Sequence, residues 1–129
     1  MKILSLIGHS RGGVAILRWL ESQENDKKVR KVILVATNSG FLKDWLIPSE
    51  TNHGFYTEDG YDFEKIKKHC TDFTVIHSKD DQWVPFKDGE KNAKDLNAKF
   101  IIFEDKNHFG INTTPKFPEL LKEILDKPE

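Results

Sequence analysis

Four short runs of apolar residues divide the chain, and in each run apolar positions follow one another rather than alternating with polar ones. The runs occupy residues 3–7, 32–36, 73–77 and 100–103. Continuous runs of this length are typical of strands that are covered on both faces of a parallel sheet. We therefore expect about four parallel strands, buried between helices.

The segments between these runs carry helical patterns. Residues 11–22 are apolar on nearly every side, which predicts a deeply buried helix. Residues 62–69 and 86–97 are more polar, as helices at a protein surface are. Strands that alternate with helices predict a series of right-handed βαβ units, and hence an α/β fold.

The last predicted helix has the clearest pattern. From Phe117 to Leu125, apolar residues fall at i, i+3, i+4, i+7 and i+8, which places them in one stripe. Thr114 is suited to cap this helix, and Pro115 to occupy its first position.

One segment, residues 37–61, fits neither pattern. It combines glycine, proline, asparagine and serine with several aromatic residues and has no clear period. We expect it to form a lid or a pocket wall within a single domain of residues 1–129.

Composition excludes several classes of partner. The chain has 129 residues, 20 basic against 21 acidic, and a formal net charge of −1, so nothing indicates nucleic acid or a membrane surface. The apolar runs are far shorter than the ~18 residues of a membrane span. The single cysteine, Cys70, and the interrupted apolar start favour a cytoplasmic protein without a signal peptide.

The most informative motif is GHSRGG, directly after the first apolar run. Gly8, Ser10 and Gly12 match the G-x-S-x-G pattern of a nucleophile elbow, a tight turn that exposes a serine between a strand and a helix. We expect the glycines to give the turn its clearance, and the Arg11 backbone N–H to face a developing oxyanion. A plain glycine turn is the alternative, whereas the known phosphate-binding glycine patterns do not match.

A serine becomes nucleophilic when a histidine takes its proton and a carboxylate orients that histidine. In elbow folds the acid and the histidine follow the serine in that order, each after a later strand. Asp81 and His108 occupy these places. Taken singly, each is equally typical of a polar loop, so only their joint spacing with Ser10 favours a triad.

The remaining histidines suggest no second chemistry. His77 lies in a predicted strand close to Asp80 and Asp81, but strand alternation scatters their directions, so we expect no metal. His53 and His69 are expected at the surface, and neither a metal nor another cofactor is required by the triad.

The motifs LIGHSRGG, HGFYTEDGYDFEKIKKHC, VIHSKDDQWVPF and EDKNHFG together resemble the small α/β-hydrolase family typified by retinoblastoma-binding protein nine and its compact bacterial relatives. The resemblance covers nearly the whole chain. It implies a triad of Ser10, Asp81 and His108, with Asp80 as a turn residue. It also implies carboxylesterase-like hydrolysis of small ester substrates without a cofactor.

The chain departs from that family in two ways. Asn107 stands where the family has glycine before the histidine. The strands that precede the elbow in the family, with a loop that completes the oxyanion hole, are not in this sequence, so the fold expected is a truncated α/β-hydrolase. Residues 3–7 would then be an unpaired edge, and we expect them to pair with a second copy or an N-terminal partner chain.

These departures keep a rival function open. The chain is alternatively a catalytically weak or inactive interaction module, or one half of a two-chain hydrolase. If it is an enzyme, aromatic residues are candidates for an apolar substrate pocket, although ordinary core packing explains each of them equally well. The candidates are Phe41, Trp45, Phe55, Trp83 and Phe109.

Overall fold

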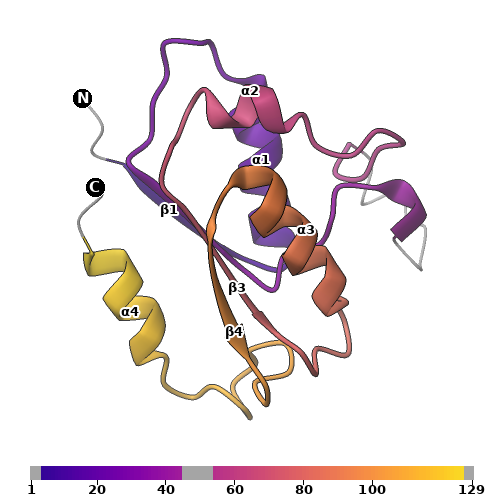
Figure 1. Ribbon diagram of the computed structural model, residues 1–129, viewed down its shortest axis with the longest axis vertical. Helices are drawn as coiled ribbons and strands as arrows, with labels where there is room; N and C mark the ends of the chain where they lie inside the picture. Colours follow the sequence, from indigo (N-terminus) through magenta and orange to yellow (C-terminus); the bar gives the residue numbers. More distant parts are fainter. Residues whose placement is uncertain (1–3, 45–53, 127–129) are drawn as a thin grey trace.

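The computed structural model describes residues 4–44 and 54–126, and its centre is a four-stranded sheet (Figure 1). The strands are β1 (Ser5–His9), β2 (Lys31–Val35), β3 (Phe73–Ser78) and β4 (Lys99–Phe103). They lie in the order β1-β2-β3-β4, and every neighbouring pair is parallel. The predicted four-stranded parallel sheet is therefore confirmed.

Helices cover both faces of this sheet (Figure 1). One face carries α1 (Arg11–Ser22), α2 (Phe63–Lys67) and α3 (Phe86–Leu96), and the other carries α4 (Pro118–Leu125). A short 3-10 helix, η1 (Leu42–Asp44), lies in the segment between β2 and α2. Each face has its own apolar core, so the sheet separates two clusters of buried side chains.

Burial differs between the central and the edge strands. Every residue of β2 and β3 is buried, whereas Ile7 of β1 is 43% exposed and Ile102 of β4 is 47% exposed. The expectation that all four strands are buried on both faces is therefore right for the centre of the sheet and wrong for its edges. The helices in the described ranges leave part of each outer strand uncovered.

Helix α1 is amphipathic, not apolar on all sides as the sequence suggested. Val14, Leu17 and Leu20 are fully buried, but Trp19 is 43% exposed. Only one side of α1 rests on the sheet, and the other side faces solvent.

Helix α4 begins later than predicted. Its N-cap is Phe117 and its first residue is Pro118, so Thr114 does not cap it and Pro115 precedes it. Proline at the first helical position loses no hydrogen bond, because that N–H has no partner inside a helix. Of the predicted apolar stripe, Phe117, Leu120 and Ile124 pack against the core, whereas Leu121 and Leu125 are 56% and 68% exposed.

The carboxyl end of α4 is held by a buried lysine. Lys31 Nζ donates hydrogen bonds to the backbone oxygens of Glu123, at 2.5 Å, and Asp126, at 2.8 Å. The last carbonyl groups of a helix lack hydrogen-bond donors within it and carry partial negative charge. An ammonium group there supplies the donor and the opposite charge. The contact fixes α4 on the sheet.

His69 is another correction. The sequence placed it at the surface, but its side chain is fully buried, and its Nδ1–H donates to the backbone oxygen of Lys27 at 2.6 Å. Cys70 beside it is also buried.

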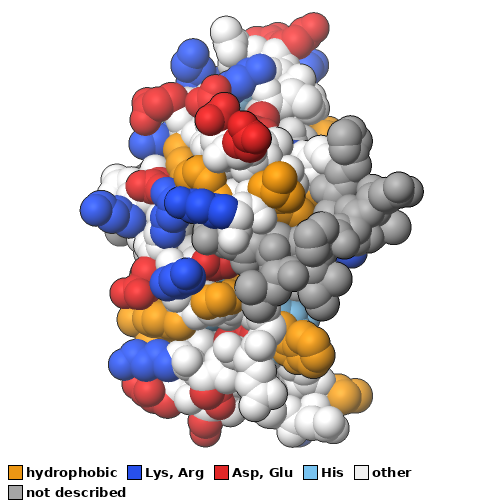
Figure 2. All heavy atoms as spheres, turned by 90° about the vertical axis from the view of Figure 1, so that its right-hand side faces the viewer, with side chains coloured by type: hydrophobic (Ala, Val, Ile, Leu, Met, Phe, Trp, Pro, Cys, Tyr) orange, Lys and Arg blue, Asp and Glu red, His pale blue; other side chains and the backbone are white. Residues whose placement is uncertain are grey.

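The described surface mixes charges of both signs. On the face shown in Figure 2, basic and acidic side chains are interspersed with apolar ones. Among the described helices, none has both the length and the apolar composition to cross a membrane.

The turn between β1 and α1 requires glycine at two positions. A Cβ on Gly8 would lie 2.6 Å from the backbone nitrogen of Gly13, and a Cβ on Gly13 would lie 1.9 Å from Thr37 Oγ1. A Cβ on Gly12 would meet nothing within 4 Å. The sequence pattern correctly singled out Gly8, but it assigned to Gly12 a clearance that the structure needs at Gly13.

We predict that Gly13→Ala and Gly12→Ala have opposite effects on stability. Gly13→Ala forces the new methyl group against the buried Thr37 side chain, and overpacking of this kind costs about 1–3 kcal/mol. Gly12→Ala replaces an uncrowded helical glycine and is expected to add about 0.5–1 kcal/mol. Urea unfolding of both variants measures the difference, and equal effects would contradict this account of the turn.

Candidate active site

The loops that follow β3 and β4 bring an aspartate and a histidine together. His108 Nδ1 lies 3.0 Å from Asp81 Oδ2 and 3.2 Å from Asp81 Oδ1. The Asp81 side chain is shielded from solvent, whereas that of His108 is 21% exposed. Because a carboxylate accepts, Nδ1 carries the proton, which leaves Nε2 of a neutral ring as an acceptor.

Backbone groups also hold the Asp81 carboxylate. The N–H groups of Trp83 and Val84 both donate to Asp81 Oδ1 at 2.9 Å. Burial alone would raise the pKa of Asp81, but the hydrogen bonds from His108, Val84 and Trp83 outweigh it and hold that pKa below its ordinary value. Asp81 is therefore an ionised acceptor at neutral pH.

The neighbouring aspartate has a different position. Asp80 Oδ1 accepts from the Ser78 hydroxyl at 2.6 Å and from the Asn107 backbone N–H at 2.8 Å. The Ser78 hydrogen bond, with help from Asn107, lowers the pKa of Asp80. Of the two aspartates, Asp81 thus contacts His108, and Asp80 joins the β3 loop to the β4 loop.

Asn107 adopts a backbone conformation that glycine commonly supplies. Its φ is 48°, in the left-handed region that asparagine tolerates better than most residues. Its Oδ1 accepts the backbone N–H of Gln82 at 2.9 Å, a bond that glycine could not make. Phe109 is also left-handed, with φ 57°, so His108 lies between two unusual turns.

His9, the last residue of β1, contacts His108. The His9 and His108 rings are 4.8 Å apart between centroids, and His9 Nε2–H donates to the His108 backbone oxygen at 2.7 Å. The sequence analysis assigned no role to His9. The available signal was its place at the end of the strand, directly before the serine.

Ser10 is the residue after His9 and has a strained backbone. Its φ is 57° and its ψ is −120°, and its N–H donates to the Val35 backbone oxygen at 2.8 Å. A serine with positive φ between a strand and a helix is the conformation expected of a nucleophile elbow. Arg11 follows as the first residue of α1, where backbone N–H groups point out of the helix.

Two of the predicted pocket residues contact Arg11 or Asp81. The Phe55 ring is 5.6 Å from the Arg11 guanidinium carbon. Trp83 is 74% exposed, and its backbone holds Asp81. Trp45 lies outside the described residues.

The other two predicted pocket residues pack elsewhere. Phe41 lies beneath the ammonium groups of Lys43 and Lys91, at 5.1 Å and 5.3 Å from their nitrogens. Phe109 is buried and stacks on Phe117, with ring centroids 5.3 Å apart. For Phe109, the core packing that the sequence left open as an alternative is what the structure shows.

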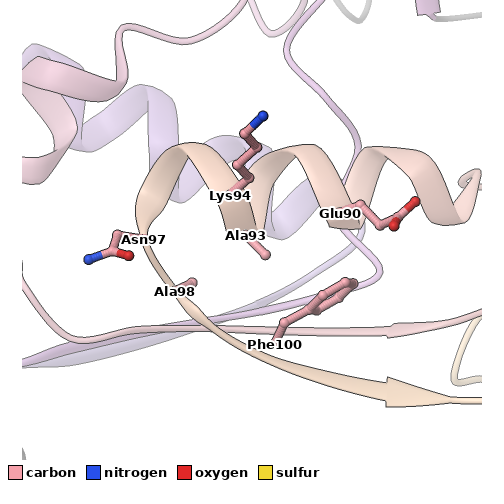
Figure 3. A pocket seen from close by; sticks show the side chains of 6 residues that line it. All are labelled: Glu90, Ala93, Lys94, Asn97, Ala98 and Phe100. Carbon is pink, nitrogen blue, oxygen red and sulfur yellow. The ribbon is translucent and has the colours of Figure 1, made fainter.

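A groove between α3 and β4 is distinct from this constellation (Figure 3). It lies at the amino end of β4, whereas His108 follows the carboxyl end. Its lining residues are Glu90, Ala93, Lys94, Asn97, Ala98 and Phe100. Among the described residues, no group of three or more metal-binding side chains occurs in this groove or elsewhere.

Comparison with known proteins agrees with this architecture. The sequence model of a family described as "Serine hydrolase" matches residues 1–123. Serine hydrolase RBBP9 of Rattus norvegicus is 33% identical over 92% of this chain and 58% of its own length. The Bacillus subtilis (strain 168) protein YdeN is 32% identical over 95% of this chain and 64% of its own length.

Solved structures show the same fold. The crystal structure of the ydeN gene product superposes with a TM-score of 0.75 at 28% identity and covers 93% of this chain and 62% of that one. The esterase domain of a Rhodothermus marinus protein superposes with a TM-score of 0.64 at 19% identity, covering 94% of this chain and 57% of that one. The chain thus spans about three fifths of the length of the relatives it matches. By its sequence and its fold, it belongs to the serine hydrolase family.

Proposed function

We propose that this chain hydrolyses small ester substrates through Ser10, His108 and Asp81. The observation that carries the proposal is the 3.0 Å contact between His108 and Asp81, next to the strained turn that holds Ser10. Family membership supports hydrolase chemistry in general. The named residues supply the nucleophile, base and acid that this chemistry requires.

The reaction would proceed by acyl transfer. The Ser10 hydroxyl attacks the ester carbonyl while its proton passes to Nε2 of His108. Asp81 stabilises the resulting imidazolium through the Nδ1–H that it already accepts. His108 then gives the proton to the leaving alcohol, and an activated water molecule releases the acid from Ser10 by the same steps.

Stabilisation of the oxyanion determines how fast this chemistry runs. We assign the Arg11 backbone N–H, at the start of α1, as one donor to the oxyanion. Loss of one such donor lowers turnover by roughly 10²–10³-fold. A complete oxyanion hole needs a second donor. With one donor alone, the proposed hydrolysis would still occur, at a lower turnover.

We predict that a fluorophosphonate probe labels the chain, and that Ser10→Ala and His108→Ala abolish labelling. Only a serine activated by a base reacts readily with this probe. Ser22→Ala, in a serine bonded to its own helix, is the matched control and should label normally. Absence of labelling in the folded chain would overturn the proposal and favour the interaction module.

We predict a large difference between the two neighbouring aspartates. Asp81→Asn is expected to lower kcat for p-nitrophenyl acetate by roughly 10³–10⁴-fold, because the amide cannot stabilise the imidazolium. Asp80→Asn should lower kcat far less, since Asp80 contacts the loops and not His108. Steady-state kinetics of both variants decide which aspartate is the acid of the triad. A larger loss of kcat in Asp80→Asn than in Asp81→Asn would assign that role to Asp80.

A second proposal, that the chain works as a pair of identical copies, is favoured by the edge at β1. Among the described residues, β1 pairs only with β2. Because the Ser10 N–H faces β2, strand alternation turns the backbone groups of Ile7 and His9 outward. We propose that this edge pairs with β1 of a second copy.

Light scattering at increasing concentration tests this pairing. We expect a dimer that Ile7→Lys dissociates, because a lysine on an exposed edge disfavours strand addition. Ile102→Lys is the matched control on the opposite edge strand, where the isoleucine is similarly exposed. A monomer at every concentration, or a dimer that only Ile102→Lys dissociates, would contradict the proposal.

A further inference from the structure

A second histidine lies behind the proposed catalytic aspartate. His77 belongs to β3, and its side chain is fully buried. Its Nε2 is 2.9 Å from the backbone oxygen of Val84 and 3.5 Å from Asp81 Oδ2. His77 therefore contacts the same loop that presents Asp81 to His108.

These contacts connect His77, Val84 and the Asp81 carboxylate. His77 Nε2–H donates to the Val84 carbonyl, and the Val84 N–H donates to Asp81 Oδ1 at 2.9 Å. The other carboxylate oxygen, Oδ2, lies between the His77 and His108 rings at 3.5 Å and 3.0 Å. Val84 thus links the two groups: its carbonyl accepts from His77, and its N–H, like that of Trp83, donates to the Asp81 carboxylate.

The His77 ring is fixed in one neutral tautomer. Nε2 must carry the hydrogen, because the carbonyl of Val84 can only accept. Nδ1 is buried without a hydrogen-bond partner among the described residues and lies against Gly89, where an added Cβ would be 2.4 Å away. Burial lowers the pKa of His77, outweighing the opposite effects of Val84 and Asp81, so the ring stays uncharged.

We propose that His77 is a positioning residue, which orients the Asp81 carboxylate toward His108 by holding the Val84 peptide. The inference rests on the proposed function, in which Asp81 is the acid of the triad. His77 touches neither substrate nor the reacting atoms, so its effect passes through Asp81. The signal in the sequence is a histidine in a mostly apolar run, four residues before the acid.

The test compares His77→Phe with His69→Phe. Both histidines are fully buried, both bond a backbone oxygen through one ring nitrogen, and each has its other ring nitrogen unpartnered among the described residues. His69 precedes β3, at the opposite end of that strand from Asp81. Both substitutions leave a backbone carbonyl without its donor, in a buried contact at Val84 and a part-buried one at Lys27, so both variants are expected to lose stability.

Three readouts separate positioning from stability. They are kcat and KM for p-nitrophenyl acetate, the rate of fluorophosphonate labelling, and the proton NMR resonance of the His108 Nδ1–H shared with Asp81. For His77→Phe we expect kcat and the labelling rate to fall roughly tenfold with KM unchanged, as for the loss of groups that orient catalytic residues. The shared proton resonance should shift or disappear. His69→Phe should leave all three readouts unchanged at a temperature where both variants are folded.

His77→Gln provides the rescue. Its side-chain amide keeps an N–H donor that can reach the Val84 carbonyl, so activity and the shared resonance should return toward those of the unmodified chain. If His77→Phe does not fold, the comparison of His77→Gln with His77→Leu takes its place. Equal effects of a variant that keeps the donor and one that lacks it would overturn the inference.

The outcomes also distinguish this inference from the proposed function. If the unmodified chain hydrolyses the ester and His77→Phe changes neither kcat nor the resonance, the function stands and the inference fails. If the unmodified chain neither labels nor hydrolyses, the function fails. The NMR resonance then still decides whether His77 positions Asp81.

Discussion

The hydrogen bond between Asp81 and His108 lies at the centre of a set of contacts that joins the loops after β3 and β4. Around it, Asp80 accepts the Asn107 N–H, and Asn107 in turn accepts the Gln82 N–H. These bonds run in both directions between the loops after β3 and β4, so neither loop can move without breaking contacts of the other. A buried carboxylate also requires partners for each oxygen, which ties the chemistry of the site to its stability.

The strand order places the two ends of this site on opposite edges of the sheet. β1 and β4 lie at opposite edges, separated by three strand spacings of about 4.8 Å each. The His9 and His108 rings are nevertheless 4.8 Å apart, so the loop after β4 must turn back across the ends of the central strands. The left-handed residues on either side of His108 make that turn, and Phe109 anchors it in the core that also holds Ile33 and Ile76.

Sequence reasoning succeeded where the determining interaction is local or follows chain order. The strand runs and the turn at Ser10 depend on short spacings, and the choice of Asp81 over Asp80 as the partner of His108 followed from the resemblance to the family. It was wrong where the outcome depends on which elements meet in space. The exposure of Ile7, the burial of His69 and the collision that makes Gly13 necessary are fixed by packing between segments that sequence periodicity does not relate.

Strained backbone conformations occur mainly at the carboxyl ends of the strands, where the proposed site lies. Five non-glycine residues in the described chain have positive φ, namely Ser10, Ala36, Asn97, Asn107 and Phe109, and all except Asn97 follow the carboxyl end of a strand. Each such conformation costs on the order of 1–3 kcal/mol and persists only where surrounding contacts impose it. At Ser10 those contacts are the bond to Val35 and the close approach of Gly8 to Gly13. A fold selected for stability alone would gain by relaxing these turns. Their concentration at the carboxyl edge of the sheet places the strained turns where the proposed site residues Ser10, Asp81 and His108 also lie.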